Sequence, residues 1–589
     1  MTGSSAGVVA PRELHARLRA RQDLVVVDVG TRDEFAAGHL SVATHVPLDH
    51  LEPRLPLLAP RPTVPVVVVG TREETVMRAV PRMAALGYTD VSVLDGGLAG
   101  WRAAGGELFT GYNTVSRALG EVALRRLGTP RVSATELRAG LDAGEDSAGE
   151  DVVLLDTRTA EEFEYTAIPT ARNTPGVELV RRAYAAVRSP HTRVVVTCAG
   201  RTRGIIGAQT LIDAGFPNPV AVLDGGLAAW SLAGYPSVAG STAPLPVPEP
   251  AQEARAGESA RALAARTGVL EISAAELSGF VAAAADRTLY LLDVRTQAEF
   301  VAGHLRGSRW APGGQLIQAT DEYVASRGAR VVLVDDGYGT RGFTTGVWLA
   351  RMGLPDVAVH LLDLDRRSPD LPRPDVRRPD LPRPDVRYFD LLRQDVVGSD
   401  VLVCGPETVP LPEVPTVSAP ALRELLDGGA AVVVDVEPPS AAGWLLARPY
   451  IPGSWVTTRS ALAAWPGLPA GEPFLVVTSG DGTLARWATA DLRAAGRGSA
   501  AALDGGTRAW REAGLPTATD SAQQPADPGK PLVLPPPPTR QQRARLHEDY
   551  IVWCAALEEQ LRRDGIVSFP VGVAAVDAGA RALGKEVAR

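Results

Sequence analysis

A single cysteine stands where a strand is predicted to end and a helix to begin. The apolar run 194–197 favours a strand and the periodic segment from Ile205 favours a helix, so Cys198 falls in the loop between them. A thiol there faces the free N–H groups of a helix N-terminus, and Arg201 and Arg203 follow in the same loop. Both features are expected to lower the pKa of the thiol. Cys198 is therefore a candidate nucleophile, although free cysteines of this kind are more often simply buried.

The composition indicates a chain of several domains. It has 589 residues, of which 45% are hydrophobic, and a length that suggests about four domains. No apolar run approaches the roughly 20 residues of a membrane span, and the net charge of −8 comes without a sustained basic stripe. We therefore expect neither nucleic acid nor a membrane as a partner. Three cysteines and the lack of a leader-like N-terminus predict a reducing, cytoplasmic location.

Two elements recur along the chain at domain-sized intervals. The first is an LDGG motif ending in tryptophan, with a weaker LLD copy, found at 94–101, 223–230, 503–510 and 361–363. The second is an apolar run ending in an aspartate, and it precedes the first element by nearly constant distances. The aspartate pairs are 28 and 95, 156 and 224, 293 and 363, and 435 and 504, which lie 67, 68, 70 and 69 residues apart. Such constancy indicates four homologous units.

Each unit alternates short β-branched runs with helix-length amphipathic stretches such as 134–141 and 205–214. This pattern predicts an α/β fold with a mainly parallel sheet flanked by helices. Ligands of such sheets bind at the carboxyl ends of the strands, where Cys198 falls. The predicted boundaries are 8–112, 126–240, 267–366 and 413–518 for the units, 241–266, 367–400 and 519–538 for linkers, and 539–565 for a C-terminal helix.

The connecting segments differ in composition. The linker 241–266 is rich in Pro, Ala and Glu and is expected to become helical from Glu258. A ten-residue duplication, identical except at its last position, fills 369–388, and its proline density predicts an extended insert. The C-terminal helix has a capping box at 539–542 and ends at Gly565. We expect it to pack on a neighbouring unit, with a partner-binding helix as the alternative.

The internal alignment predicts one active unit. Forty-two residues after the first aspartate, the first three units carry Gly70, Cys198 and Asp335, and the fourth has Ser479 two residues later. The other three loops lack a nucleophile paired with a basic cradle. A single active site at Cys198 is therefore the expectation.

The ordered set of motifs resembles that of the rhodanese sulfurtransferases. The shared features are the Asp-x-Arg-like element, Glu-Phe-x-x-Gly-His-Leu at 34–40 and 299–305, the Cys loop followed by a helix, and the terminal Leu-Asp-Gly-Gly-x-x-x-Trp. The resemblance covers roughly 11–105, 130–237, 271–365 and 416–516. It implies a tandem rhodanese with one active domain and three that have lost the cysteine.

The resemblance also implies the chemistry. Cys198 would accept a sulfane sulfur from a small anionic donor, thiosulfate or 3-mercaptopyruvate, and pass it as a persulfide to cyanide or a thiol. No cofactor or metal is implied. Arg158 would reach the same site, with a structural ion pair to Glu162 as the alternative. The residues expected to cradle the sulfur and the donor are Ala199, Gly200, Arg201, Thr202, Arg203 and Gly204.

Three other functions compete with sulfur transfer. A Cys/His hydrolase is disfavoured, because unit two has Thr166-Ala167 where units one and three have Gly38-His39 and Gly303-His304. These two histidines are expected to be structural. A phosphatase of related fold has five residues between cysteine and arginine, whereas this loop has four. The third alternative is a non-catalytic scaffold or persulfide carrier that binds a protein partner, in keeping with three units that lack the thiol.

The other two cysteines are expected to be structural. Cys404 precedes a Gly-Pro turn and is predicted to be a strand residue beside a linker, with a persulfide relay or a disulfide to Cys198 as the alternatives. Cys554 lies in the predicted C-terminal helix and is expected to be packed there.

Overall fold

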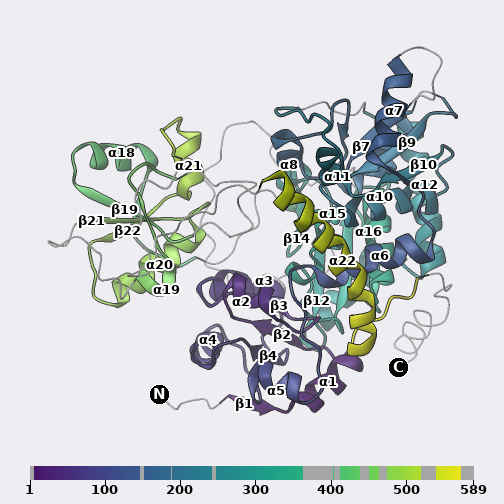
Figure 1. Cartoon of the computed structure of the whole chain (residues 1–589). Coiled ribbons are helices and arrows are strands. Elements are labelled where there is room, and N and C mark those ends of the chain that lie inside the picture. The colour runs from purple at the N-terminus through teal and green to yellow at the C-terminus, as the bar shows by residue number, and fades with distance from the viewer. Residues whose placement is uncertain are drawn as a thin grey trace.

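The computed structural model describes residues 6–145, 152–187, 189–241, 247–362, 402–403, 411–437, 450–462, 474–518 and 539–571. Within these residues the chain forms four five-stranded sheets in which neighbouring strands run parallel. Helices flank each sheet, which confirms the predicted α/β architecture (Figure 1). The predicted linkers 367–400 and 519–538 lie outside the described residues.

The first two units repeat one succession of elements. The first contains β1 (Gly7–Val9), α1 (Pro11–Arg19), β2 (Val25–Asp28), α2 (Arg32–Ala37), β3 (Thr44–His45), η1 (Leu48–His50), α3 (Leu51–Leu58), β4 (Val66–Val69), α4 (Glu73–Ala85), β5 (Val91–Leu94) and α5 (Gly97–Ala103). The second contains β6 (Arg131–Val132), α7 (Ala134–Glu145), β7 (Val152–Asp156), α8 (Ala160–Tyr165), β8 (Arg172–Asn173), α9 (Glu178–Ala186), β9 (Arg193–Thr197), α10 (Thr202–Asp213), β10 (Val220–Leu223) and α11 (Gly226–Leu232).

The other two units vary the same plan. The third contains β11 (Leu270–Ile272), α13 (Ala274–Ala282), η2 (Ala283–Ala285), β12 (Leu289–Asp293), α14 (Gln297–Ala302), β13 (His304–Leu305), β14 (Arg309–Trp310), α15 (Gly313–Gln318), η3 (Thr320–Glu322), β15 (Arg330–Asp335), α16 (Thr340–Arg351) and β16 (Val357–Leu361). The fourth contains β18 (Thr416–Val417), α18 (Ala419–Asp427), β19 (Ala431–Asp435), β20 (Trp455–Val456), α19 (Arg459–Leu462), β21 (Phe474–Thr478), α20 (Thr483–Ala494), β22 (Ala500–Leu503) and α21 (Gly506–Glu512). A short strand, β17 (Leu402–Val403), pairs antiparallel with β13.

All four sheets share one strand order. It reads β1-β5-β4-β2-β3 in the first unit, β6-β10-β9-β7-β8 in the second, β11-β16-β15-β12-β14 in the third and β18-β22-β21-β19-β20 in the fourth. The strand that leads to the aligned Cys198 position is therefore the central strand of every sheet. A central strand pairs on both sides, so its carboxyl end is a fixed platform for the loop that follows.

Alternating side chains of β9 fill two hydrophobic layers. Val194 and Val196 pack with α9 and α10 on one face, and Val195 packs with Trp230 on the other. The first layer continues into unit three through Trp348, whose indole N–H donates to Thr210 Oγ1 at 2.7 Å. Units two and three thus share a core. Among the described residues, no helix has the length and apolar character that a membrane crossing requires.

Two helices connect the first three units. The first is α6 (Thr114–Arg126), between units one and two, and the second is α12 (Pro250–Thr267), between units two and three. The prediction of a linker that becomes helical only from Glu258 was wrong, because the helix begins eight residues earlier. One face of α12 packs against α9 and α16. The side chains on this face are small and apolar, so burying them is more favourable than leaving them in contact with water. The buried residues of that face are Ala256, Ala260, Leu263 and Ala264.

The C-terminal helix α22 (Arg540–Asp564) has the predicted ends. The Thr539 side chain accepts from the Gln542 N–H, and the chain leaves the helix at Gly565 with φ of 68°. Leu557 and Leu561 are buried in the core of unit one, so the predicted packing on a neighbouring unit is confirmed. Figure 1 shows α22 (yellow) running along α6, and the two helices are in contact.

Candidate active site

Cys198 lies at the end of the central strand of unit two, directly after β9, and its side chain is buried. Helix α10 begins at Thr202, three residues before the predicted start at Ile205. The backbone N–H groups of Gly200 and Gly204 hydrogen-bond to the sulfur. Of the residues 199–204 that were expected to cradle the sulfur, Gly200 and Gly204 thus place a backbone donor at the thiol.

The repeated LDGG motif packs against the backbone of this loop and hydrogen-bonds to it. In unit two, Gly226 has φ of 55°, and a Cβ there would lie 2.5 Å from the carbonyl oxygen of Cys198 and 2.6 Å from that of Gly200. The Leu227 N–H donates to the Cys198 carbonyl at 2.9 Å. The motif thus ties α11 to the active-site loop, and a side chain at position 226 would displace the backbone that carries the thiol.

We predict that Gly226→Ala destabilises unit two by about 1–3 kcal/mol and alters the reactivity of Cys198 several-fold. Gly215→Ala is the matched control, since Gly215 has φ of 73° with no atom within 4 Å of a Cβ. It carries the cost of the left-handed backbone alone. Thermal denaturation and the rate of Cys198 alkylation by iodoacetamide test both variants. Equal effects of the two variants on alkylation would contradict the assigned role of the motif.

Arg203 lies beside the thiol, as predicted. Its guanidinium is close enough to favour the Cys198 thiolate electrostatically, and it forms a two-pronged ion pair with Glu162 at 2.6 and 2.8 Å. Glu162 accepts from Arg158 only through its backbone carbonyl, at 3.0 Å. The predicted alternative, an ion pair between Arg158 and Glu162, is therefore not formed, because Arg203 takes the carboxylate.

Arg201 serves a different purpose from the one predicted. Its guanidinium binds both oxygens of Glu121 on α6, at 2.7 and 3.0 Å, and Asp224 at 2.8 Å. These ion pairs join the active-site loop to α6 and to the LDGG turn. Since two carboxylates already compensate its charge, Arg201 is an anchor of the loop more than a free anion receptor.

Arg158 does not reach the sulfur site, contrary to the sequence-based expectation. It is 3% exposed, donates to both oxygens of Asp156 and hydrogen-bonds to the Thr166 carbonyl at 2.6 Å. Arg295 forms the same ion pair with Asp293 in unit three, which has no cysteine at the aligned position. The Asp-x-Arg element therefore stabilises the fold of a unit whether or not the unit carries the thiol.

The prediction of a lowered thiol pKa was wrong for the resting protein. Burial raises the pKa of Cys198, and this is the largest of the influences on it. The charge of Arg203 and the N–H groups of Gly200 and Gly204 lower that pKa, whereas the charge of Asp156 raises it. The helix N-terminus and the arginine are present as expected, but desolvation outweighs them.

The raised pKa predicts the pH dependence of Cys198 reactivity. Since the thiolate is the reacting form, alkylation by the neutral reagent iodoacetamide should accelerate about tenfold per pH unit between about pH 6 and pH 8, with no plateau in that range. The measurement is the alkylation rate of the Cys198 peptide by mass spectrometry. A plateau near pH 7 would show a pre-ionised thiolate and contradict this prediction.

The active-site loop opens into a cavity of about 450 Å³. Its other walls come from α11 of unit two, from α6, from the end of α15 in unit three and from the C-terminal helix α22. The lining residues outside the loop are Ser116, Arg117, Ala228, Gln318, Arg543, Leu546, His547 and Tyr550.

A histidine from the C-terminal helix, His547, lies at the Cys198 site, although unit two has no histidine at its own motif position. It lines the Cys198 cavity, and a Cβ on Gly225 would lie 2.9 Å from its Nε2. Burial, followed by the charge of Arg201, lowers the pKa of His547. The ring is thus neutral near pH 7. The motifs around Cys198 do not indicate this residue, because His547 lies in the C-terminal helix, far from Cys198 in the sequence.

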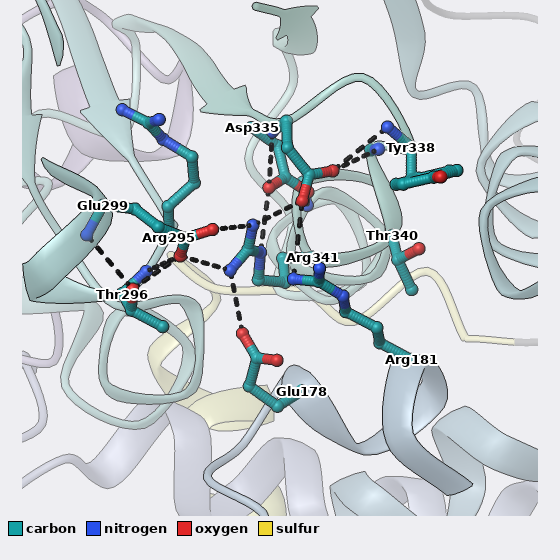
Figure 2. A network of polar contacts seen from close by, with 12 residues as sticks. Glu178, Arg181, Arg295, Thr296, Glu299, Asp335, Tyr338, Thr340 and Arg341 are labelled. Carbon is teal, nitrogen blue, oxygen red and sulfur yellow. Dashed lines mark hydrogen bonds and ion pairs between the residues drawn. The ribbon is translucent and has the colours of Figure 1, made fainter. Parts of the chain in front are cut away.

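The aligned loop of unit three contains its own anion. The carboxylate of Asp335 accepts from the N–H groups of Asp336 and Gly342, each at 2.8 Å, and from Arg341 Nε at 2.9 Å (Figure 2). Arg341 also binds Glu178 of unit two at 2.9 Å. A fixed carboxylate therefore occupies the cradle position of unit three, and its arginine forms a contact between the units.

The two motif histidines have a structural role. His39 and His304 hydrogen-bond through Nδ1 to the carbonyls of Phe35 and Phe300, as predicted. Cys554 is a buried free thiol on α22. Cys404 lies outside the described residues.

Comparison with known proteins agrees with the fold. The rhodanese-like domain model matches residues 10–104, 133–233 and 273–363, and the fourth unit has the same strand order. The crystal structure of thiosulfate sulfurtransferase from Pseudomonas aeruginosa is 37% identical, with a TM-score of 0.77 over 96% of this chain and 99% of that one.

A second relative matches only part of the chain. Thiosulfate sulfurtransferase GlpE from Pseudomonas fluorescens (strain SBW25) is 33% identical over 88 residues, which are 15% of this chain and 79% of that protein. The longer match extends over nearly the whole of both chains. The chain is thus a homologue of thiosulfate sulfurtransferase and belongs to the rhodanese family.

Proposed function

We propose that the protein transfers sulfane sulfur from an anionic donor, thiosulfate or 3-mercaptopyruvate, through a persulfide on Cys198 to a thiophilic acceptor such as cyanide or a thiol. The observation that carries this proposal is the position of Cys198 at the base of a cavity, with the N–H groups of Gly200 and Gly204 on its sulfur and Arg203 beside it. These groups favour an anionic sulfur, and both the thiolate and the persulfide are anionic.

With thiosulfate the reaction has two steps. The Cys198 thiolate attacks the outer sulfur, the S–S bond of thiosulfate breaks, and sulfite leaves with the electron pair. Cyanide then attacks the outer sulfur of the persulfide, and thiocyanate leaves while the thiolate returns. The Gly200 and Gly204 donors compensate the negative charge on sulfur in both states. No general base is required once the thiolate has formed, which fits a site without a histidine in the loop itself.

The test is thiocyanate formation from cyanide with each donor, together with the intact mass of the protein after donor treatment. A gain of about 32 Da, one sulfur atom, is expected without acceptor and should disappear when cyanide is added. If no donor produces either signal in the wild-type protein, the hypothesis of a non-catalytic scaffold is favoured instead. Two observations favour that scaffold hypothesis. Units two and three share a core, and Arg341 of unit three forms an ion pair with Glu178 of unit two.

A further inference from the structure

The arginines that the motif supplies are both compensated by carboxylates. Arg203 is paired with Glu162, and Arg201 is paired with Glu121 and Asp224. A doubly charged donor such as thiosulfate needs positive charge that is still available when it arrives. The source of that charge therefore has to be sought on the other walls of the cavity.

Arg117 on α6 lies on one of those walls, in the same cavity as Cys198. Its Nε donates to the Tyr112 carbonyl at 2.9 Å, and its Nη1 donates to the hydroxyl of Tyr550 on α22. The described part of the chain places no carboxylate within ion-pair distance of its guanidinium. Glu121, one helical turn away on α6, is engaged by Arg201 instead.

Two aromatic rings of α22 hold the Arg117 guanidinium in place. Its central carbon lies 5.0 Å from the centre of the Tyr550 ring and 5.4 Å from that of Trp553. Aromatic faces stabilise a cation without neutralising it, so the full charge is retained for a ligand. Tyr550 also approaches the active-site loop, since a Cβ on Gly200 would lie 3.5 Å from its ring. The charge is thus fixed on the wall that faces the loop.

We propose that Arg117, positioned by Tyr550 of the C-terminal helix, binds the anionic group of the sulfur donor in the Cys198 cavity. The inference deepens the proposed function and rests on it for the identity of the ligand. Arg117 belongs to the connection between units one and two, and Tyr550 to the segment after unit four. The donor site of unit two would then be completed by parts of the chain that a single rhodanese unit lacks.

The first test is the dependence of persulfide formation on thiosulfate concentration in Arg117→Gln. Loss of a charge-assisted hydrogen bond should raise the half-saturating concentration about tenfold or more. Arg117→Lys should recover part of this. Arg125→Gln is the matched control, because Arg125 lies on the same helix, pairs with Glu558 of α22 and does not line the cavity. It should remain within about twofold of wild type.

The second test does not depend on turnover. Alkylation of Cys198 by iodoacetate, an anion, is compared with alkylation by neutral iodoacetamide, each followed on the Cys198 peptide. In Arg117→Gln the ratio of the two rates should fall several-fold while the iodoacetamide rate is retained. An unchanged ratio would overturn the proposal, whether the two rates stay the same or fall by the same factor. If wild type forms no persulfide with any donor, the proposed function fails, yet this ratio still decides whether Arg117 binds anions.

Discussion

Replacement of Cys198 by serine is expected to abolish sulfur transfer, with a loss of at least about 10⁴-fold in turnover with any donor. Serine fits the same space after β9, and the N–H groups of Gly200 and Gly204 can still donate to its oxygen. The hydroxyl, however, does not ionise near neutral pH and cannot form a persulfide. The loss would therefore report the chemistry of sulfur rather than a collapsed loop.

Intact mass provides the direct measurement. Wild type treated with thiosulfate should gain about 32 Da, and Cys198→Ser should gain nothing. Cys554→Ser is the matched control, since Cys554 is also a buried free thiol in the described part of the chain but does not line the cavity. It should gain the same mass as wild type. A mass gain that survives in Cys198→Ser, or that disappears in Cys554→Ser, would place the persulfide elsewhere.

The division of the protein into four units could be predicted from the sequence, because the same motifs recur at nearly constant intervals along the chain. The constant distance between Asp156 and the LDGG motif, repeated four times, identified the units and placed Cys198 at a strand end. Local chemistry was also predictable: the capping box at Thr539 and the structural histidines were correct. These features depend on residues a few positions apart.

What could not be predicted depends on partners that are distant in sequence. Arg201 and Arg203 follow a recognisable pattern, but their carboxylates, Glu121 and Glu162, come from separate helices. Whether an arginine is free or compensated is decided by such partners. The prediction of the thiol pKa was wrong because it considered only nearby residues and left out burial, to which the whole fold contributes. Composition alone misled at α12, where alanines that suggest a linker instead permit close helix packing.

The degenerate unit three illustrates a change of use for the same loop. Asp335 places a carboxylate where Cys198 places a sulfur, and Arg341 follows it as Arg203 follows the cysteine. In unit two the cradle favours an anion that forms during the reaction. In unit three the anion is a carboxylate of the protein itself, and the arginine bound to it reaches across to unit two. The second large effect that we predict therefore concerns stability.

Arg341→Met is expected to destabilise the junction of units two and three by about 3–5 kcal/mol. The Arg341 side chain is 1% exposed and is bonded to Asp335, Asp336, Glu299 and Glu178 at 2.7–2.9 Å. Methionine fills most of the volume but leaves these four carboxylates, three of them buried, without their common cation. Arg261→Gln is the control in the same unit, because the exposed pair of Arg261 and Glu271 should contribute less than about 1 kcal/mol.

Hydrogen exchange of α9 and α16, together with urea denaturation, measures the effect where it occurs. Burial already raises the pKa of Asp335 to about 6 in the presence of Arg341. Because this is above the value of an unfolded aspartate, the native state binds the extra proton, and the contribution of Asp335 to stability falls as the pH rises through about 6. Arg341→Met should therefore recover part of its stability on acidification below pH 6, and Asp335→Asn in the same chain should recover part of it at pH 8. A loss that neither change reduces would mean that Arg341 acts through packing rather than through its charge.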